Sequence, residues 1–384
     1  MSAALGCASW RQCIQKLQCA ALALTLAACA GGPWRPGDGA PRVATAPAPS
    51  SAERYCAWYG AASEGVLYFG QAAFWSAMRG AGGDPQADLA QPGPQLVGRF
   101  DLAREALLPP LQVGRGGERS GVWDVLPAPD GRVFFTTFFE SAGAVDPRTG
   151  AVEHFPGLGR GLNELAPGPD ASVLVTRYGS GRDATGDGEL VAVSPEGEAL
   201  RRWPLPPPAG FRTAPKTPAW DAPRGALWVT TDLLPTDDPS APDRHDAYLL
   251  DPDDGLQRRI AGPELHFAAS RADGTLYLAE AAGAELHLRV KPPPGAGAER
   301  RYRLDGAFPA ELDFVQDIQP AADGRVALTR WSGAVHVLHP DGRVGRAQLP
   351  RLDPEGLYYT GVLHGERLCA TYCADVSVVC IDAP

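Results

Sequence analysis

Residues 123–157 have the sequence WDVLPAPDGRVFFTTFFESAGAVDPRTGAVEHFPG, in which short apolar runs alternate with turn-forming residues. A first extended run ends at Pro129-Asp130-Gly131, a turn signal. The β-branched and aromatic run Arg132–Phe139 predicts a fully buried strand. Two more strands are expected on either side of the turn residues Asp146–Gly150. The stretch therefore predicts four short antiparallel strands.

Weaker copies of this unit recur along the chain, which predicts an all-β fold, a single β-propeller of four-stranded antiparallel blades. One such sheet cannot bury both of its apolar faces alone, so neighbouring sheets must stack on it. The first turn of each unit has a glycine, or Ala171 in the third unit: Gly65, Gly131, Gly225, Gly274, Gly324 and Gly365. We therefore expect seven blades, with six blades and an irregular closing hairpin as the alternative. The last unit shows only three strands, and the segment before Cys56 is the candidate for its missing outer strand.

Composition and charge limit the domain count and the partners. The chain has 384 residues, with 45 Gly and 38 Pro, which suits one large turn-rich domain that we place at residues 54–384. Residues 29–53 are rich in Ala, Pro and Gly, and predict a disordered tether. The formal net charge of −10 argues against nucleic acid as a partner.

Residues 1–28 predict a lipoprotein signal peptide. The apolar run Leu17–Ala28 leads into Leu26-Ala27-Ala28-Cys29, which resembles the lipobox of bacterial lipoproteins. We therefore expect a lipid on Cys29 that anchors the chain to a membrane of the bacterial cell envelope, on its extracytoplasmic side. Ala30 after the cysteine favours the outer membrane in a Gram-negative cell. A plain secretory signal cut near Ala28 is the alternative.

Four cysteines follow the predicted anchor, and an oxidising compartment favours disulfides between them. A two-residue loop at Ala374-Asp375 would place Cys369 opposite Cys380, at a cross-strand separation close to what a disulfide tolerates. Cys56 and Cys373 would then join the first and last blades. The two other connectivities, and metal binding by the four thiols, are the alternatives.

The phrases WDVLPAPDGRVFFTT and GAVDPRTGAVEHFPG resemble the repeat of virginiamycin B lyase-type propellers and, more loosely, those of NHL and gluconolactonase-type propellers. VQDIQPAADGRVALT, in the sixth unit, repeats the first phrase. The resemblance is clear in units two and six, partial in units three to five, and faint in the first and last. These motifs are structural, so they specify the fold better than an activity.

The start of each inner strand lies seven positions before the turn glycine, near the central channel. This position holds Asp124, Glu164 and Asp317 in units two, three and six, and the other units have Trp58, Pro218, Phe267 and Tyr358 there. Carboxylates that converge on one channel mouth can coordinate Ca²⁺ or Mg²⁺, or hold a cationic ligand. The alternative is that each carboxylate caps a neighbouring strand or lies in channel water.

The resemblance also implies a catalytic site. Virginiamycin B lyases use a Glu-x-His pair, a second histidine on a nearby inner strand and a divalent metal. Glu264 and His266 match the pair, and strand alternation puts both on one face of the fifth inner strand. The inner strand of unit four offers no second histidine. The other histidines that we considered fall on outer strands or turns: His154, His336, His339 and His364.

Two functions follow from these features. The first is an extracytoplasmic lipoprotein whose propeller is a scaffold for a small ligand or another protein. The second is a metal-dependent lyase or lactone hydrolase at the channel mouth, with the site residues named above. The longest insertions fall between second and third strands, on the same face as the mouth, and binding sites usually lie on such elaborated loops.

Overall fold

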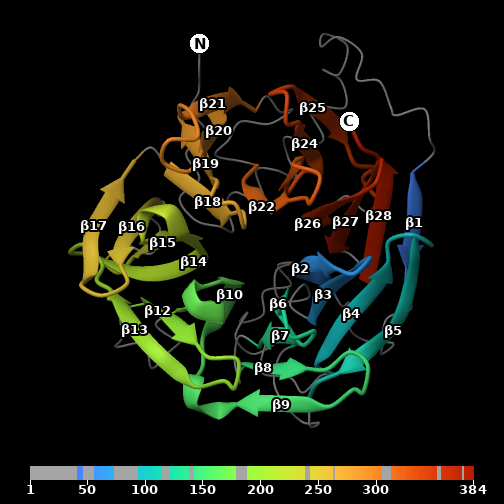
Figure 1. Cartoon of the computed structure of the whole chain (residues 1–384), viewed down its shortest axis with the longest axis horizontal. Coiled ribbons are helices and arrows are strands. Elements are labelled where there is room, and N and C mark those ends of the chain that lie inside the picture. Colours follow the sequence, from blue (N-terminus) through green and yellow to red (C-terminus); the bar gives the residue numbers. More distant parts are fainter. Residues whose placement is uncertain are drawn as a thin grey trace.

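The computed structural model describes residues 41–45, 56–72, 94–114, 121–137, 142–178, 188–237, 243–262, 264–304, 313–352, 356–373 and 376–384. They form seven four-stranded antiparallel sheets arranged as a ring (Figure 1). The predicted seven-bladed propeller is confirmed, and the six-bladed alternative is wrong. The predicted signal peptide, Cys29 and most of the tether lie outside the described residues. Within the described ranges, no helix has the length and apolar character needed to cross a membrane.

The strands follow the chain blade by blade. The first three blades contain β2 (Cys56–Ser63), β3 (Val66–Ala72), β4 (Leu96–Asp101), β5 (Ala106–Gln112), β6 (Asp124–Pro127), β7 (Val133–Thr136), β8 (Ala142–Val145), β9 (Val152–Phe155), β10 (Leu162–Pro167), β11 (Val173–Arg177), β12 (Gly188–Val193) and β13 (Ala199–Leu205). The next three contain β14 (Phe211–Asp221), β15 (Ala226–Pro235), β16 (Arg244–Asp251), β17 (Gly255–Ala261), β18 (Glu264–Ser270), β19 (Leu276–Ala282), β20 (Glu285–Lys291), β21 (Arg300–Arg303), β22 (Val315–Pro320), β23 (Val326–Arg330), β24 (Ala334–Leu338) and β25 (Val344–Gln348). The seventh contains β26 (Leu357–His364), β27 (Arg367–Cys373), β28 (Val376–Asp382) and β1 (Arg42–Thr45).

The tight turns of the opening unit follow the predicted chemistry. Gly131 has a φ of +87°, and Asp130 Oδ1 accepts the backbone N–H of Arg132 at 2.9 Å. Gly150, which closes the turn between β8 and β9, has a φ of +76°. Ala171, which takes the glycine position in blade three, has a φ of +59° and therefore adopts the left-handed conformation that glycine favours.

The core lies between neighbouring blades. Phe134 and Phe155 of blade two have ring centroids 5.7 Å apart and belong to one buried cluster with Val173 and Val191 of blade three. Each such side chain contributes about 1.5–3 kcal/mol when it is fully buried. Because both faces of a blade are apolar, every sheet needs a neighbour on each side, and a closed ring supplies both.

The ring closes through the two ends of the chain. β1 pairs antiparallel with β28, with Arg42 opposite Cys380, and so supplies the outer strand that the seventh blade lacked. This confirms closure by the segment before Cys56, and it places one strand within the predicted tether. Disulfides join Cys56 to Cys373 and Cys369 to Cys380, as predicted. The first joins blade one to blade seven.

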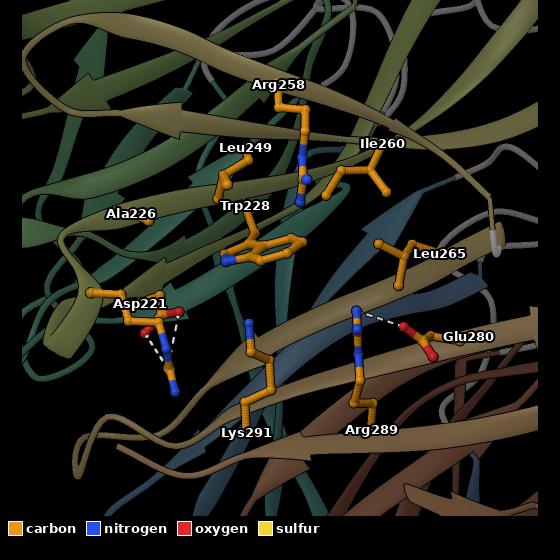
Figure 2. Close-up of a pocket in the computed structure, with 11 residues that line it drawn as sticks. Asp221, Ala226, Trp228, Leu249, Arg258, Ile260, Leu265, Glu280, Arg289 and Lys291 are labelled. Carbon is orange, nitrogen blue, oxygen red and sulfur yellow. Dashed lines mark hydrogen bonds and ion pairs between the residues drawn. The ribbon is translucent and has the colours of Figure 1, made fainter. Parts of the chain in front are cut away.

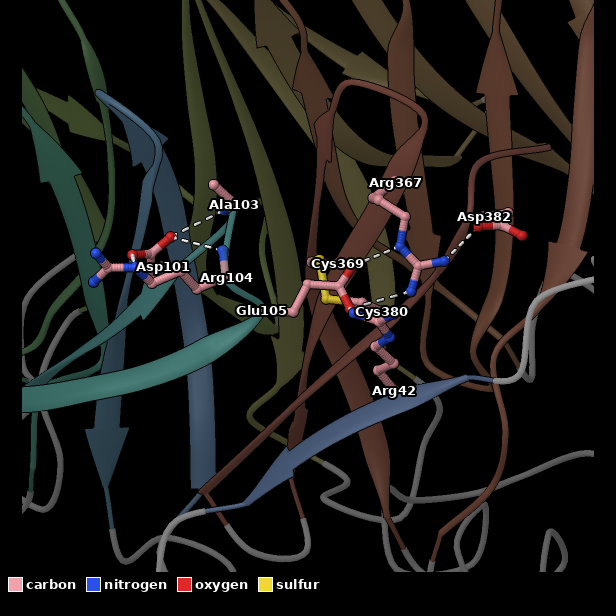
Figure 3. Close-up of a disulfide and its surroundings, with 9 residues drawn as sticks. All are labelled: Arg42, Asp101, Ala103, Arg104, Glu105, Arg367, Cys369, Cys380 and Asp382. Atoms are coloured by element: carbon pink, nitrogen blue, oxygen red, sulfur yellow. Dashed lines mark hydrogen bonds and ion pairs between the residues drawn. A yellow bond between two sulfur atoms is a disulfide. The ribbon is translucent and has the colours of Figure 1, made fainter.

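An ion-pair network reinforces the closure. Glu105 lies in the turn between β4 and β5. Its carboxylate forms ion pairs with Arg367 of β27 (Nε to Oε1, 2.6 Å) and with Arg42 of β1 (Nη1 to Oε2, 3.4 Å). Figure 3 shows Glu105 beside the Cys369–Cys380 disulfide, with the two arginines directed toward it. The Cys56–Cys373 disulfide and the Glu105–Arg367 ion pair therefore hold blade one against blade seven.

Candidate functional site

The inner strands surround the central axis (Figure 1), and six of the seven have an irregular register near their first residues. In β18 the irregularity lies between Leu265 and Phe267, so His266 is the extra residue. In β14 it lies between Pro215 and Pro218 and includes Lys216. A bulge changes the direction of the side chains at that point. The bulges therefore decide which residues face the axis.

Buried threonines on the second strands fix these bulges. Thr176 of β11 accepts the backbone N–H of Glu164 at 3.1 Å and donates its hydroxyl to the carbonyl of Lys216 in the next blade at 2.7 Å. Thr136 donates in the same way to the carbonyl of Asn163 at 2.7 Å. A buried backbone group needs a partner when a bulge removes its ladder bond. The threonines supply that partner and connect each bulge to the next blade.

The three predicted carboxylates lie at the inner-strand starts and are almost fully buried. Burial, and then the charge of Glu164, raise the pKa of Asp124 well above its usual range. Burial raises the pKa of Glu164 to about 7 even though Lys216 lowers it, and burial also raises the pKa of Asp317 to about 7. The charge of Glu164 also raises the pKa of Asp317, and the charge of Asp317 raises the pKa of Asp124, so the three carboxylates are electrostatically linked.

Their oxygens have structural partners. Asp124 Oδ1 accepts the N–H of Val125 at 2.7 Å, and its Oδ2 accepts the N–H of Leu165 in blade three at 2.8 Å. Both oxygens of Asp317 accept from Gln319 Nε2, at 3.1 and 2.9 Å. Within the described ranges, no three His, Cys, Asp or Glu side chains are grouped closely enough to hold a metal ion. The Ca²⁺ or Mg²⁺ site stays a prediction.

Aromatic side chains fill the axial side of blades seven, one and two. Trp58 stacks on Trp123 with ring centroids 4.3 Å apart, and Tyr59 meets Tyr359 edge-on at 5.2 Å. The irregular register of β26 brings Tyr359 to this cluster, whereas Tyr358 packs on Tyr372 between blades. Counting from the turn glycine had pointed to Tyr358, because the count assumed a regular strand.

Glu264 and His266 lie at the start of β18, as predicted. Glu264 Oε2 is 3.9 Å from His266 Nε2, which is too long for a hydrogen bond. Both ring nitrogens of His266 are buried without a hydrogen-bond partner among the described residues. Burial lowers the pKa of His266 to about 4, so this imidazole is neutral at physiological pH. Glu264 is half-buried, and its interaction with His266 lowers its pKa.

A second histidine lies beside this pair. His245, on β16 of blade four, has its ring centroid 5.5 Å from that of His266. Its Nδ1 is 2.7 Å from Asp232 Oδ1 on the neighbouring strand β15. The sequence analysis sought a second histidine on the inner strand of unit four alone, whereas β16 begins at Arg244 and carries His245 beside His266. The unusual length of the apolar run after Gly225 was the available signal.

Lys216 and Phe314 complete the surroundings of the two histidines. Lys216 Nζ of blade four is 3.5 Å from Asp232 Oδ2. Phe314, just before β22 of blade six, packs on both histidines, with its ring centroid 5.3 Å from His245 and 4.8 Å from His266. We call His245, His266, Asp232, Lys216 and Glu264 the axial cluster.

Opposite charges set the protonation of the axial cluster. Burial on its own would raise the pKa of Asp232, but Lys216 and His245 outweigh it and lower this pKa to about 2. Burial likewise opposes the charged form of His245, and the charge of Asp232 outweighs it and raises the pKa of His245. The cluster therefore places a proton-binding imidazole beside a neutral one, with an ionised carboxylate behind the first.

No protein-family model matches the chain, and no curated protein matches it. Among solved structures, it is similar to a catalytically inactive histidine-to-alanine variant of virginiamycin B lyase from Staphylococcus aureus with quinupristin. The two share 12% identity at a TM-score of 0.56, over 90% of this chain and 100% of that one. These likenesses show the fold alone.

Two other solved structures have the same architecture. An extracellular domain assigned to a hybrid two-component system of B. thetaiotaomicron matches with 9% identity and a TM-score of 0.54, over 91% of this chain and 42% of that one. The Swd1 β-propeller domain of Myceliophteria thermophila matches with 11% identity and a TM-score of 0.54, over 86% and 97%. Their roles differ, so the ring is a common scaffold and the function must be argued from the site.

Proposed function

We propose that the protein is a lipid-anchored propeller of the bacterial cell envelope that acts as a scaffold for a ligand or another protein, with the axial cluster as its binding site. The lipobox-like sequence ending at Cys29 supports the anchor. The two disulfides suit an oxidising compartment. The observation that carries the choice of site is His245, held by Asp232 beside the neutral ring of His266.

The axial cluster has the groups that a polar ligand requires. Lys216 and His245 are hydrogen-bond donors with 22% and 13% of their side chains exposed. Glu264, with 49% exposed, is an acceptor. Asp232 and Phe314 hold the donors in place, since each contacts both Lys216 and His245. A ligand with a carbonyl or anionic oxygen beside a donor group fits this arrangement.

A second candidate function is acid–base catalysis, which the paired imidazoles favour. Sites in which neighbouring groups have pKa values pushed in opposite directions divide the acid and base roles between them. The likeness to virginiamycin B lyase, at the level of fold, points to an elimination.

The groups of the axial cluster can perform an elimination without further reactants. The Glu264 carboxylate removes a proton from the carbon next to a carbonyl group. The electron pair forms a double bond to the adjacent carbon as the bond between that carbon and the ester oxygen breaks. His245 donates its Nε2 proton to that oxygen, with Asp232 stabilising the imidazolium. His266, packed on Phe314, lies beside Glu264 as a neutral imidazole.

Incubation with quinupristin tests both functions. An isomeric product, detected by mass spectrometry, indicates elimination, and a product heavier by one water indicates hydrolysis. His245→Gln should abolish either reaction, whereas His336→Gln, a buried histidine of β24 outside the cluster, should not. Calorimetric binding without turnover, lost in Lys216→Met, supports the scaffold. Binding or turnover that survives both cluster substitutions places the site elsewhere.

The anchor has an independent test. Cys29→Ser should prevent incorporation of labelled palmitate and move the protein from the membrane fraction to the soluble extracytoplasmic fraction. Cys19→Ser, which changes a cysteine within the signal, is the matched control. Unchanged labelling of Cys29→Ser would contradict the lipid anchor.

A further inference from the structure

A cavity of about 350 Å³ lies between blades four and five. It is bordered by β15, β16 and β17 on one side and by β18, β19 and β20 on the other (Figure 2). Leu265 lines it, whereas the two residues beside Leu265 in sequence belong to the axial cluster. The cavity is therefore distinct from that cluster. Its volume is within the range of small-molecule sites, about 300–1,000 Å³.

The walls of this cavity carry more positive than negative charge, in a protein whose formal net charge is −10. The charged lining residues are Arg224, Arg258, Arg289 and Lys291, with Asp221 and Glu280. Arg224 pairs with Asp221 at 2.9 Å, and Arg289 pairs with Glu280 at 2.6 Å. Across the described residues, Arg258 and Lys291 have no carboxylate within ion-pair distance. These two cations therefore have no ion-pair partner in the described part of the chain.

Trp228 forms the centre of the cavity. Figure 2 shows Arg258 and Lys291 directed toward its indole from opposite sides. Lys291 Nζ is 5.1 Å from the ring centroid, a cation–π contact that holds the ammonium group in the cavity. The indole is only 6% exposed, and its Nε1 has no acceptor within the described part of the chain. A buried donor without an acceptor destabilises a fold, so an oxygen at this point would be favourable.

The charges around Lys291 also favour an anion in the cavity. Burial lowers its pKa, and the charges of Arg224 and Arg289 lower it further. An anion between these groups would relieve their repulsion and favour the charged form of the lysine.

We propose that this cavity binds a small organic anion through its carboxylate or phosphate group. Arg258 and Lys291 neutralise the anion, and Trp228 Nε1–H donates a hydrogen bond to one of its oxygens. The guanidinium of Arg258 matches the planar pair of oxygens that both groups present. The remaining apolar wall, from Leu249, Ile260 and Leu265, covers the body of the ligand.

The indole resonance of Trp228 tests the proposal directly. Protein labelled with ¹⁵N-tryptophan is titrated with D-glucuronate, with D-glucose 6-phosphate and with uncharged D-glucose, all at one ionic strength. Trp228→Phe identifies the resonance. The Trp228 signal should move and saturate with at least one anion and stay in place with glucose. Tighter binding of the phosphate or of the carboxylate identifies the anion class.

Charge variants decide whether the cavity itself is responsible. Arg258→Gln and Lys291→Gln should each lower the affinity for the anion by tenfold or more. Arg148→Gln removes an exposed, ion-paired arginine of blade two and should leave the affinity unchanged. Arg258 is exposed on the outer strand β17, so its substitution leaves the core intact even if the tryptophan variant misfolds. Absence of a saturable shift with both anions, or unchanged affinity in both glutamine variants, overturns the proposal.

Discussion

Loss of the Cys56–Cys373 disulfide is expected to cost far more stability than loss of Cys369–Cys380. The two bridges join residues 317 and 11 positions apart. In the chain-entropy description, a cross-link stabilises the fold by restricting the unfolded chain, and the effect grows as 1.5RT times the logarithm of loop length. The constant part cancels between the bridges, so the two loop lengths give a difference of about 3 kcal/mol at 25 °C.

The comparison uses two double variants, Cys56→Ala with Cys373→Ala and Cys369→Ala with Cys380→Ala. All four cysteines have 0% exposure, so the packing lost is the same in kind for both pairs. Equilibrium unfolding in guanidinium chloride gives the two free energies of unfolding. Equal losses, or a larger loss for the short bridge, would refute the reasoning. Loop length in the unfolded chain would then not determine the difference between the two bridges.

Three further outcomes are expected. Glu164→Gln should stabilise the protein at pH 8 by up to about 3 kcal/mol but should have no such effect below pH 4.5. The reason is that a carboxyl whose pKa is raised to about 7 in the folded protein loses its favourable protonated state as pH rises through that value. Denaturation at both pH values checks this, and an equal effect at the two pH values would contradict it. Asp232→Asn should lower the pKa of His245, measured by NMR titration, since burial would then act unopposed; an unchanged pKa argues against the pairing. If Asp124, Glu164 and Asp317 hold Ca²⁺ or Mg²⁺, the purified protein will contain the metal and a chelator will lower its Tm; neither effect would be seen if these carboxylates only cap strands.

The repeat could be predicted from local chemistry. A left-handed turn position restricts the residue types that can occupy it, so Gly131 and its equivalents mark each blade, and even Ala171 marked its turn correctly. The disulfides followed from hairpin register at Cys369 and Cys380. These features depend on residues close in sequence, or on a simple count of blades.

The residues around the axis depend on bulges, which a regular count cannot anticipate. Tyr359 replaces Tyr358 in the axial aromatic cluster because the register of β26 shifts after Tyr358. His245 reaches His266 because β15 and β16 are longer than the inner strand position alone suggests. Beside the shift in β26, Thr371 accepts the N–H of Thr360 at 3.0 Å and donates its hydroxyl to the carbonyl of Trp58 in blade one at 2.9 Å, a contact that local sequence does not reveal.

The two candidate sites use opposite sides of the same strand, which has a consequence for their independence. Leu265 of β18 faces the cavity between blades four and five, and His266 lies in the axial cluster. Leu265 is almost fully buried and lies next to the bulge at His266. An anion bound in the cavity would therefore pack beside this bulge. Because a bulge is fixed by its hydrogen bonds and packing, occupation of the cavity would hold the bulge in one arrangement. The inter-blade cavity and the axial cluster therefore share β18, and they also share β15 and β16, which carry Trp228 with Asp232 and Leu249 with His245. Coupling between the two sites should therefore weaken when Leu265→Ala loosens the packing of β18.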